Sequence, residues 1–167
     1  MLFRSYLDTA YTDKQENDPT ALLAWFTDAE KLYLTHCSVV RKEFPELIAW
    51  LQTFVHLIGY SQQSRVFVEP KASGKSVAQM LKRQTGLNII EDAPPKDSKV
   101  TRVNVVSPIL EAGRVFVPEN ENWVDAFLTE CTAFPNATHD DQVDCLVGSI
   151  RRGLMYINYQ GRKSRRI

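Results

Sequence analysis

The pattern of apolar and polar residues in the first quarter of the chain predicts three strands rather than helices, and in the first of them the two kinds alternate loosely. The alternation covers Leu2–Ala10, and two runs rich in β-branched, aromatic and leucine residues cover Thr20–Thr27 and Lys31–Val40. A short polar break at Asp28 separates the last two runs and suits a hairpin. We therefore expect the first three strands to form an antiparallel meander.

The spacing of apolar residues then changes to three and four, which predicts a helix over Phe44–Tyr60. Arg65–Glu69 is a short β-branched run that predicts a strand, Val77–Gln84 has a helical pattern, and Leu87–Ile90 predicts another strand. A strand, a helix and a strand in succession favour a right-handed crossover and a parallel strand pair.

Four further elements are expected after this unit. They are a helix over Lys99–Leu110, a strand over Gly113–Val117, a helix over Asn122–Thr132 and a last helix over Asp140–Tyr156. The predicted fold class is α/β, with a central mixed sheet of about five or more strands, three antiparallel and then parallel, flanked by helices. We expect one domain over residues 1–157 and a basic, flexible tail over 158–167.

Charge is balanced over the whole chain but segregated along it. The 167 residues contain 20 Lys+Arg and 20 Asp+Glu, which argues against a protein that holds nucleic acid by bulk positive charge. Residues 1–30 carry 2 basic and 6 acidic residues, 65–114 carry 9 and 5, 119–144 carry none and 7, and 151–167 carry 6 and none. No apolar run long enough to cross a membrane occurs, so we expect a cytoplasmic protein without a membrane partner.

The densest group of acids is His139-Asp140-Asp141-Gln142-Val143-Asp144, at the start of the last predicted helix. Asp140 and Asp141 could simply complement the positive end of the helix dipole, with Thr138 in a capping-box arrangement. A metal-binding His-Asp doublet of the all-helical phosphohydrolase kind is a second possibility. That kind of site needs more histidines, and the chain has three in total.

Two more acids stand out by their position. Glu69 ends a strand whose other residues look buried, and Asp8 lies within the first predicted strand. Either could be a solvent-exposed strand residue. Carboxylates from three separate elements, Asp8, Glu69 and Asp141, could instead hold two divalent cations that activate water against a phosphodiester. Ligands that are all oxygen favour Mg²⁺ or Mn²⁺.

Four stretches of the sequence resemble the C-terminal nuclease domain of large terminase subunits of tailed bacteriophages, which has a ribonuclease H-like fold. They are Val66–Gly74, Ser98–Arg102, Glu111–Pro118 and Ala133–Asp144, of which the last is the most specific. The resemblance implies that Asp8, Glu69 and Asp141 are the catalytic, metal-binding acids. It also implies accessory roles for Asp140 and Asp144, a place near the site for His139, and phosphate contacts for Lys71, Lys75, Lys99 and Arg102, for which ordinary surface charge is the alternative.

The resemblance further implies a two-metal endonuclease that cuts concatemeric double-stranded DNA during viral genome packaging. The implied partners are DNA, the terminase ATPase domain, the small terminase subunit and the portal, and the isolated domain is expected to be monomeric. Ser73-Gly-Lys-Ser76 looks like the end of a phosphate-binding loop, but Glu69 stands where the first glycine is required, so no ATPase is predicted. Other ribonuclease H-like nucleases, such as a junction resolvase or an RNA–DNA hybrid cutter, and a non-catalytic DNA- or portal-binding module remain as alternatives.

Overall fold

The structure is a computed structural model that describes residues 3–9, 19–70 and 77–156. Lys71, Lys75, Ser73–Ser76 and the 158–167 tail lie outside these residues. The elements in chain order are β1 (Arg4–Asp8), β2 (Thr20–Asp28), β3 (Lys31–Val40), α1 (Phe44–Leu57), β4 (Arg65–Val68), α2 (Val77–Thr85), β5 (Ile89–Glu91), α3 (Lys99–Glu111), β6 (Val115–Phe116), α4 (Val124–Ala133), α5 (Asp141–Ile150) and the π-helix η1 (Arg151–Met155).

The described strands form one mixed sheet in the order β5-β4-β1-β2-β3-β6. β1, β2 and β3 pair antiparallel, which confirms the predicted meander. β4 joins β1 in parallel, and β5 joins β4 in parallel through the α2 crossover, as the pattern predicts. β6 adds to the far edge beside β3, also in parallel. The predicted α/β class with a mixed sheet is therefore confirmed.

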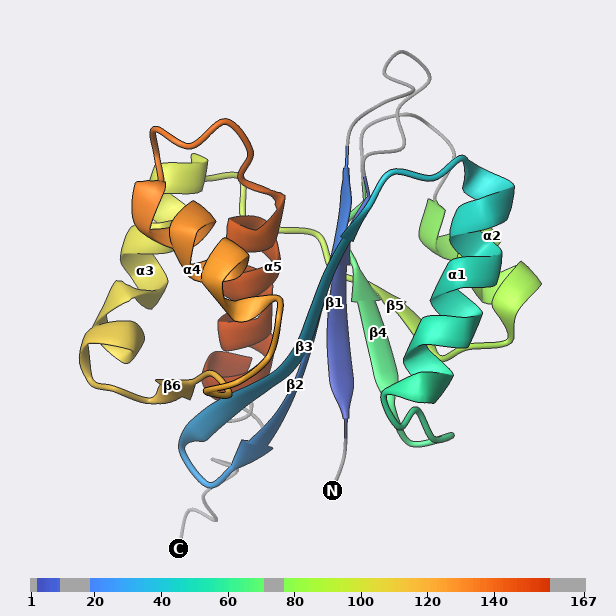
Figure 1. Cartoon of the computed structure of the whole chain (residues 1–167), viewed down its shortest axis with the longest axis horizontal. Helices are drawn as coiled ribbons and strands as arrows, with labels where there is room; N and C mark the ends of the chain where they lie inside the picture. Colours follow the sequence, from blue (N-terminus) through green and yellow to red (C-terminus); the bar gives the residue numbers. More distant parts are fainter. Residues whose placement is uncertain (1–2, 10–18, 71–76, 157–167) are drawn as a thin grey trace, which may run out of the picture.

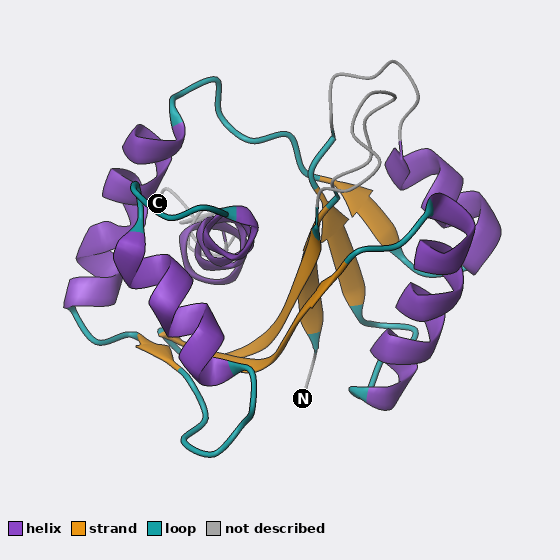
Figure 2. Ribbon diagram, turned by 45° about the horizontal axis from the view of Figure 1, so that its top comes forward, coloured by secondary structure: helices purple, strands orange, loops and turns teal. Residues whose placement is uncertain are grey.

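Helices cover both faces of this sheet (Figure 1). α1 and α2 lie on one face, while α3, α4 and α5 lie on the other. Figure 2 shows α5 nearly end-on, between the sheet and the outer helices of its layer. Every residue of α5 from Gln142 to Ile150 is buried, so this helix is the centre of its layer.

α5 lies very close to β1 because a glycine faces the strand. A side chain at Gly148 would overlap the ring of Tyr6, which is itself 1% exposed. The Cys145 thiol, on the neighbouring face of the helix, lies 3.4 Å from the Ala21 carbonyl oxygen and 3.6 Å from that of Tyr6. The single helix expected over Asp140–Tyr156 is divided in the structure, since α5 ends at Ile150 and continues as η1.

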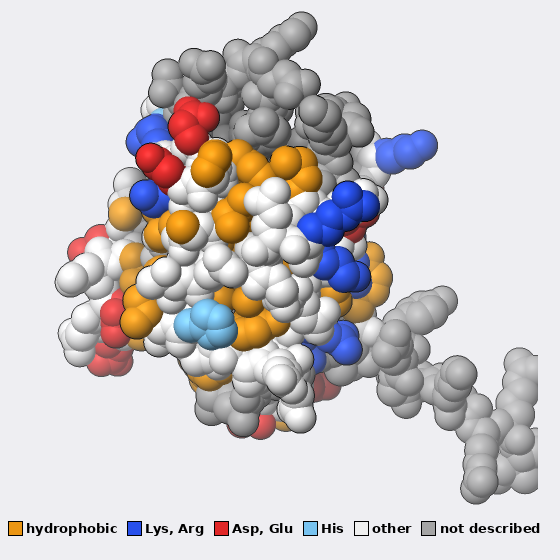
Figure 3. All heavy atoms as spheres, turned by 90° about the vertical axis from the view of Figure 1, so that its right-hand side faces the viewer, with side chains coloured by type: hydrophobic (Ala, Val, Ile, Leu, Met, Phe, Trp, Pro, Cys, Tyr) orange, Lys and Arg blue, Asp and Glu red, His pale blue; other side chains and the backbone are white. Residues whose placement is uncertain are grey.

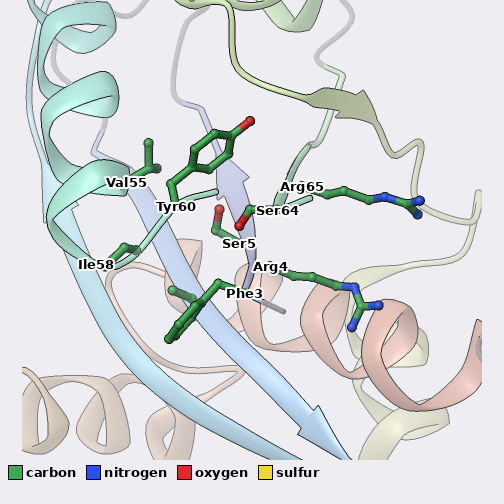
Figure 4. Close-up of a pocket in the computed structure, with 9 residues that line it drawn as sticks. Phe3, Arg4, Ser5, Val55, Ile58, Tyr60, Ser64 and Arg65 are labelled. Atoms are coloured by element: carbon green, nitrogen blue, oxygen red, sulfur yellow. The ribbon is translucent and has the colours of Figure 1, made fainter. Parts of the chain in front are cut away.

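The first strand has charges of opposite sign at its two ends. Arg4, at its start, pairs in register with Arg65 of β4, and Figure 4 shows both side chains extending in the same direction beside a small pocket. Burial, and then the charge of Arg65, lower the pKa of Arg4. Asp8 ends the same strand. The outer face of α1 and α2 shows apolar, polar and basic side chains together (Figure 3).

Candidate metal centre

Asp8 and Glu69 are neighbours at the carboxyl ends of two parallel strands. Leu7 of β1 pairs with Val68 of β4, and the backbone N–H of Glu69 donates a hydrogen bond to the Leu7 carbonyl oxygen at 3.2 Å. Both acids follow Tyr6 and Phe67 by two residues, so the period of a strand places them on the face beneath α5. Asp8 is 1% exposed, and Glu69 is 12% exposed.

Arg102 of α3 connects Glu69 to Asp144 of α5. The Arg102 Nη2 lies 3.3 Å from Asp144 Oδ1, and the Arg102 Nη1 lies 3.8 Å from Glu69 Oε2. The side chains of Arg102 and Asp144 are 10% and 6% exposed. Buried charges are costly unless paired, so this guanidinium and these carboxylates stabilise one another.

Lys99, one turn before Arg102, adds a second cation to the cluster. Its Nζ lies 2.8 Å from Asp144 Oδ2 and 2.6 Å from Asp140 Oδ1. Burial lowers the pKa of Lys99, but the hydrogen bonds to Asp140 and Asp144 outweigh it and the pKa is raised overall. Ser98 caps α3 by accepting from the Thr101 N–H at 3.2 Å, which fixes the first turn that carries these cations.

The negative charge of the cluster extends to the groups beneath it. Burial raises the pKa of the Tyr6 hydroxyl, and Asp92 and Glu69 raise it further. Burial most of all, and then the charge of Asp8, raise the pKa of the Cys145 thiol, with a further contribution from Asp144. Asp8, Glu69 and Asp144 therefore act on the same region between β1 and α5.

Asp141 and His139 have a different environment. They line a cavity of about 300 Å³ between α5, α4 and the ends of β2 and β3. Its other lining residues are Pro19, Cys37, Val39, Arg41, Trp123, Ala126, Glu130 and Gln142.

The sequence-predicted residues thus come together in part. Asp8, Glu69, Asp140 and Asp144 lie at one end of the sheet, while Asp141 and His139 lie at the adjacent cavity. Lys99 and Arg102, expected to contact phosphates, are ion-paired with the acids. Lys71 and Lys75 lie outside the described residues.

Two features of this layer were missed by the sequence interpretation. Glu130 of α4 accepts hydrogen bonds from the backbone N–H and the side chain of Gln142. Asp92, 1% exposed, pairs with Arg152. Only the position of Asp92 directly after a β-branched strand could have signalled a buried acid.

A metal ion requires several oxygen ligands around one point. Within residues 3–9, 19–70 and 77–156, no three His, Cys, Asp or Glu side chains are placed to hold one. The carboxylates nevertheless suit Mg²⁺ or Mn²⁺ in donor type, and Asp144 already accommodates two positive groups. The residues therefore fit a divalent cation in chemistry and charge, provided that a side-chain cation moves.

The mixed sheet, the crossover and the acids at the ends of β1 and β4 define a ribonuclease H-like fold. A sequence profile of the terminase RNase H-like domain matches residues 5–151, so the chain belongs to this family. Among functionally curated proteins, no sequence gives a significant match.

Solved structures that superpose on this chain include proteins from phages and from human cytomegalovirus. The large terminase of a thermophilic bacteriophage superposes with a TM-score of 0.65 at 15% identity, over 90% of this chain and 39% of that one. The human cytomegalovirus terminase nuclease domain gives 0.64 at 12% identity, over 89% and 81%. The large terminase nuclease domain of bacteriophage SPP1 with bound Mn gives 0.63 at 16%, over 91% and 86%. The chain thus spans about two fifths of the thermophilic phage protein.

Among the described residues, no helix has both the length and the apolar character needed to cross a membrane.

Proposed function

We propose that this domain is a metal-dependent endonuclease that hydrolyses phosphodiester bonds of double-stranded DNA. The observation that supports it best is the cluster around Arg102, where Glu69, directly after β4, and Asp144 of α5 lie beside the buried Asp8. Buried carboxylates gathered from separate elements are typical of sites that bind a cation or perform chemistry.

In this proposal, Asp8, Glu69, Asp141 and Asp144 hold two Mg²⁺ or Mn²⁺ ions, with Asp140 as an accessory acid. Bound divalent cations supply Lewis acidity for the attacking water and for the leaving oxygen. Glu69 and Asp144 orient the site, because Arg102 restrains both carboxylates from one side. His139, at the rim of the adjacent cavity, orients a carboxylate or a water. The Mn bound in the SPP1 nuclease domain supports the choice of cation.

The biological role we propose is the cutting of concatemeric viral DNA during genome packaging. Family membership supports it, as does the large terminase of the thermophilic phage, of which this chain spans only a part. The partners in that role are DNA, a terminase ATPase domain, a small terminase subunit and the portal. Lys71, Lys75, Lys99 and Arg102 are the proposed phosphate contacts.

The test is cleavage of supercoiled plasmid by the purified chain with Mn²⁺, with Mg²⁺ and with EDTA. We expect nicked and linear products with either metal and none with EDTA. Glu69→Gln and Asp8→Asn should each reduce the rate by at least about 100-fold, because each removes an oxygen ligand. Glu46→Gln, which changes an exposed acid in the first turn of α1 on the opposite face, is the matched control and should cut normally.

Substrate choice is tested in the same assay. Linear duplex, a four-way junction and an RNA–DNA hybrid are compared at equal concentration. Preference for the junction or the hybrid would replace the packaging role with that of a resolvase or a hybrid cutter. Full cleavage by both acid variants would remove the proposed site.

A further inference from the structure

Both carboxylate oxygens of Asp144 are engaged by side-chain cations of α3. Oδ1 faces Arg102 Nη2 at 3.3 Å, and Oδ2 faces Lys99 Nζ at 2.8 Å. A divalent ion that binds Asp144 needs one of the same oxygens. Each carboxylate oxygen can take more than one partner, but a divalent ion bound there would lie close to both side-chain cations and repel them, so metal binding favours the departure of one of them.

The two cations differ in how firmly they are held. Arg102 is 10% exposed and also lies 3.8 Å from Glu69. If it moved away from Asp144, buried charges on Glu69, Asp144 and the guanidinium would lose their partners, which is costly. Lys99 is 43% exposed, on a long flexible side chain. Solvent screens this ammonium, so its pair with the largely buried Asp144 is worth about a five- to tenfold change in an equilibrium constant. Lys99 is the cation that leaves.

Asp140 gives the displaced ammonium a second partner. Its Oδ1 lies 2.6 Å from Lys99 Nζ, and its side chain is 38% exposed. The two contacts share one ammonium, so Lys99 can lose Asp144 and keep Asp140. The movement needs only side-chain rotation at the surface, while Arg102 continues to hold Glu69 and Asp144.

We propose that Lys99 is an internal counter-ion of the metal centre, which neutralises Asp144 in the metal-free chain and is displaced toward Asp140 when a divalent cation binds. The proposal rests on the metal site of the proposed function. It makes Lys99 a competitor of the metal and Arg102 a positioning residue. Lys99 also becomes available for a DNA phosphate only once the metal has taken its place.

Calorimetric titration of the full chain with Mn²⁺ tests this exchange. Lys99→Met keeps the length of the side chain and removes its charge, so we expect Mn²⁺ to bind about five- to tenfold more tightly. Lys99→Arg keeps the competing charge and should bind Mn²⁺ no more tightly than the unaltered chain. Lys96→Met, at an exposed lysine three residues earlier, is the matched control and should stay within about twofold.

Thermal denaturation gives a second readout that does not depend on cleavage. In EDTA, Lys99→Met should melt at a lower temperature than the unaltered chain, because the carboxylates of Asp140 and Asp144 lose a neutralising charge. Saturating Mn²⁺ should then raise the melting temperature of Lys99→Met by more than it raises that of the unaltered chain.

The outcomes separate this inference from the function on which it rests. If the unaltered chain binds Mn²⁺ and Lys99→Met binds it equally or less tightly, Lys99 is not a competitor and the inference is wrong. If neither chain binds Mn²⁺, the metal centre itself is wrong, and the inference is lost with it. Tighter binding by both Lys99→Met and Lys99→Arg would show that side-chain shape, not charge, is the cause, and would also overturn it.

Discussion

The first turn of α5 is held differently on its two flanks. On the α3 flank, Asp144 is bound by the full charges of Lys99 and Arg102. On the α4 flank, Gln142 forms hydrogen bonds instead: its Oε1 accepts one from the Cys37 thiol at 3.3 Å, and its backbone N–H donates one to Glu130 at 2.7 Å. The α3 flank therefore sets the charge of the acid cluster, whereas the α4 flank sets the position of the helix and borders the cavity.

The difference between the two flanks is tested most strongly by replacing one acid on each: Asp144, which faces α3, and Asp141, which lines the cavity beside α4. Asp144→Asn and Asp141→Asn should each reduce plasmid cleavage by at least about 100-fold, because both are proposed to bind the metal ions. They should differ in stability. Asp144→Asn leaves Arg102 with a single weak partner and should cost about 2 kcal/mol of unfolding free energy. Asp141→Asn, at the first residue of α5, should cost less, about 0.5–1 kcal/mol, because it removes a charge at the positive end of the helix dipole.

Urea denaturation in EDTA measures the stability difference without interference from bound metal. Asp125→Asn, in the first turn of α4, is the control for losing an acid near a helix N-terminus. Equal destabilisation by Asp144→Asn and Asp141→Asn would show that the two flanks restrain α5 in the same way. Normal cleavage by Asp141→Asn would leave Asp144 as the acid that α5 supplies.

The next prediction concerns the contact of α5 with the sheet, where Gly148 lies against Tyr6 of β1. Gly148→Ala adds a methyl group where the ring of Tyr6 already lies. Alanine favours a helix over glycine by about 1 kcal/mol. The clash with a fully buried ring costs about 1–3 kcal/mol and should outweigh it, because Tyr6 cannot move into solvent. We expect a net loss of about 1 kcal/mol in urea denaturation, with weaker cleavage as α5 shifts from β1.

The matched control is the double substitution with Tyr6→Leu. If the ring is the cause, Gly148→Ala should cost less in the Tyr6→Leu background than alone, which gives a favourable coupling energy. A stabilising effect of Gly148→Ala by itself would mean that α5 has room to move, and the close contact of this helix with β1 would be wrong.

The pattern of residues predicts the helices and strands well, but it predicts the tertiary contacts between them poorly. Strand alternation and helical spacing are local, so the meander, the crossover and every helix follow from the sequence. The division of the last helix does not follow from the sequence, since Gly153 of η1 lies against Leu32 and Trp25, contacts that local spacing does not reveal.

The acids illustrate the same limit. Their spacing places Asp140, Asp141 and Asp144 within about one turn. It does not tell which of them faces α3 and which faces the cavity. That depends on where α3 and α4 pack, and α3 lies far from these acids along the chain. Lys99 and Arg102 share a helix face by their spacing of three, yet nothing local identifies the carboxylates as their partners.

The smallest expected effect is on the α4 flank, at the Cys37 thiol. Burial raises its pKa to about 12, with the nearby Cys131 and Glu130 adding to the shift. Removing the charge of Glu130 favours the thiolate and lowers this pKa, but burial remains. Glu130→Gln should therefore increase alkylation of Cys37 by iodoacetamide at mildly alkaline pH by only about two- to threefold, measured by mass spectrometry of each cysteine.

Glu130→Gln also weakens the bonds to Gln142, at a cost of about 1 kcal/mol. The control is Glu119→Gln, an exposed acid outside α4, which should change neither the alkylation rate nor the stability. An increase of about 100-fold at Cys37 would mean that Glu130 seals the cavity against solvent, because charge alone at a partly screened distance cannot shift a pKa so far. The α4 flank would then control access to the acids as well as the position of α5.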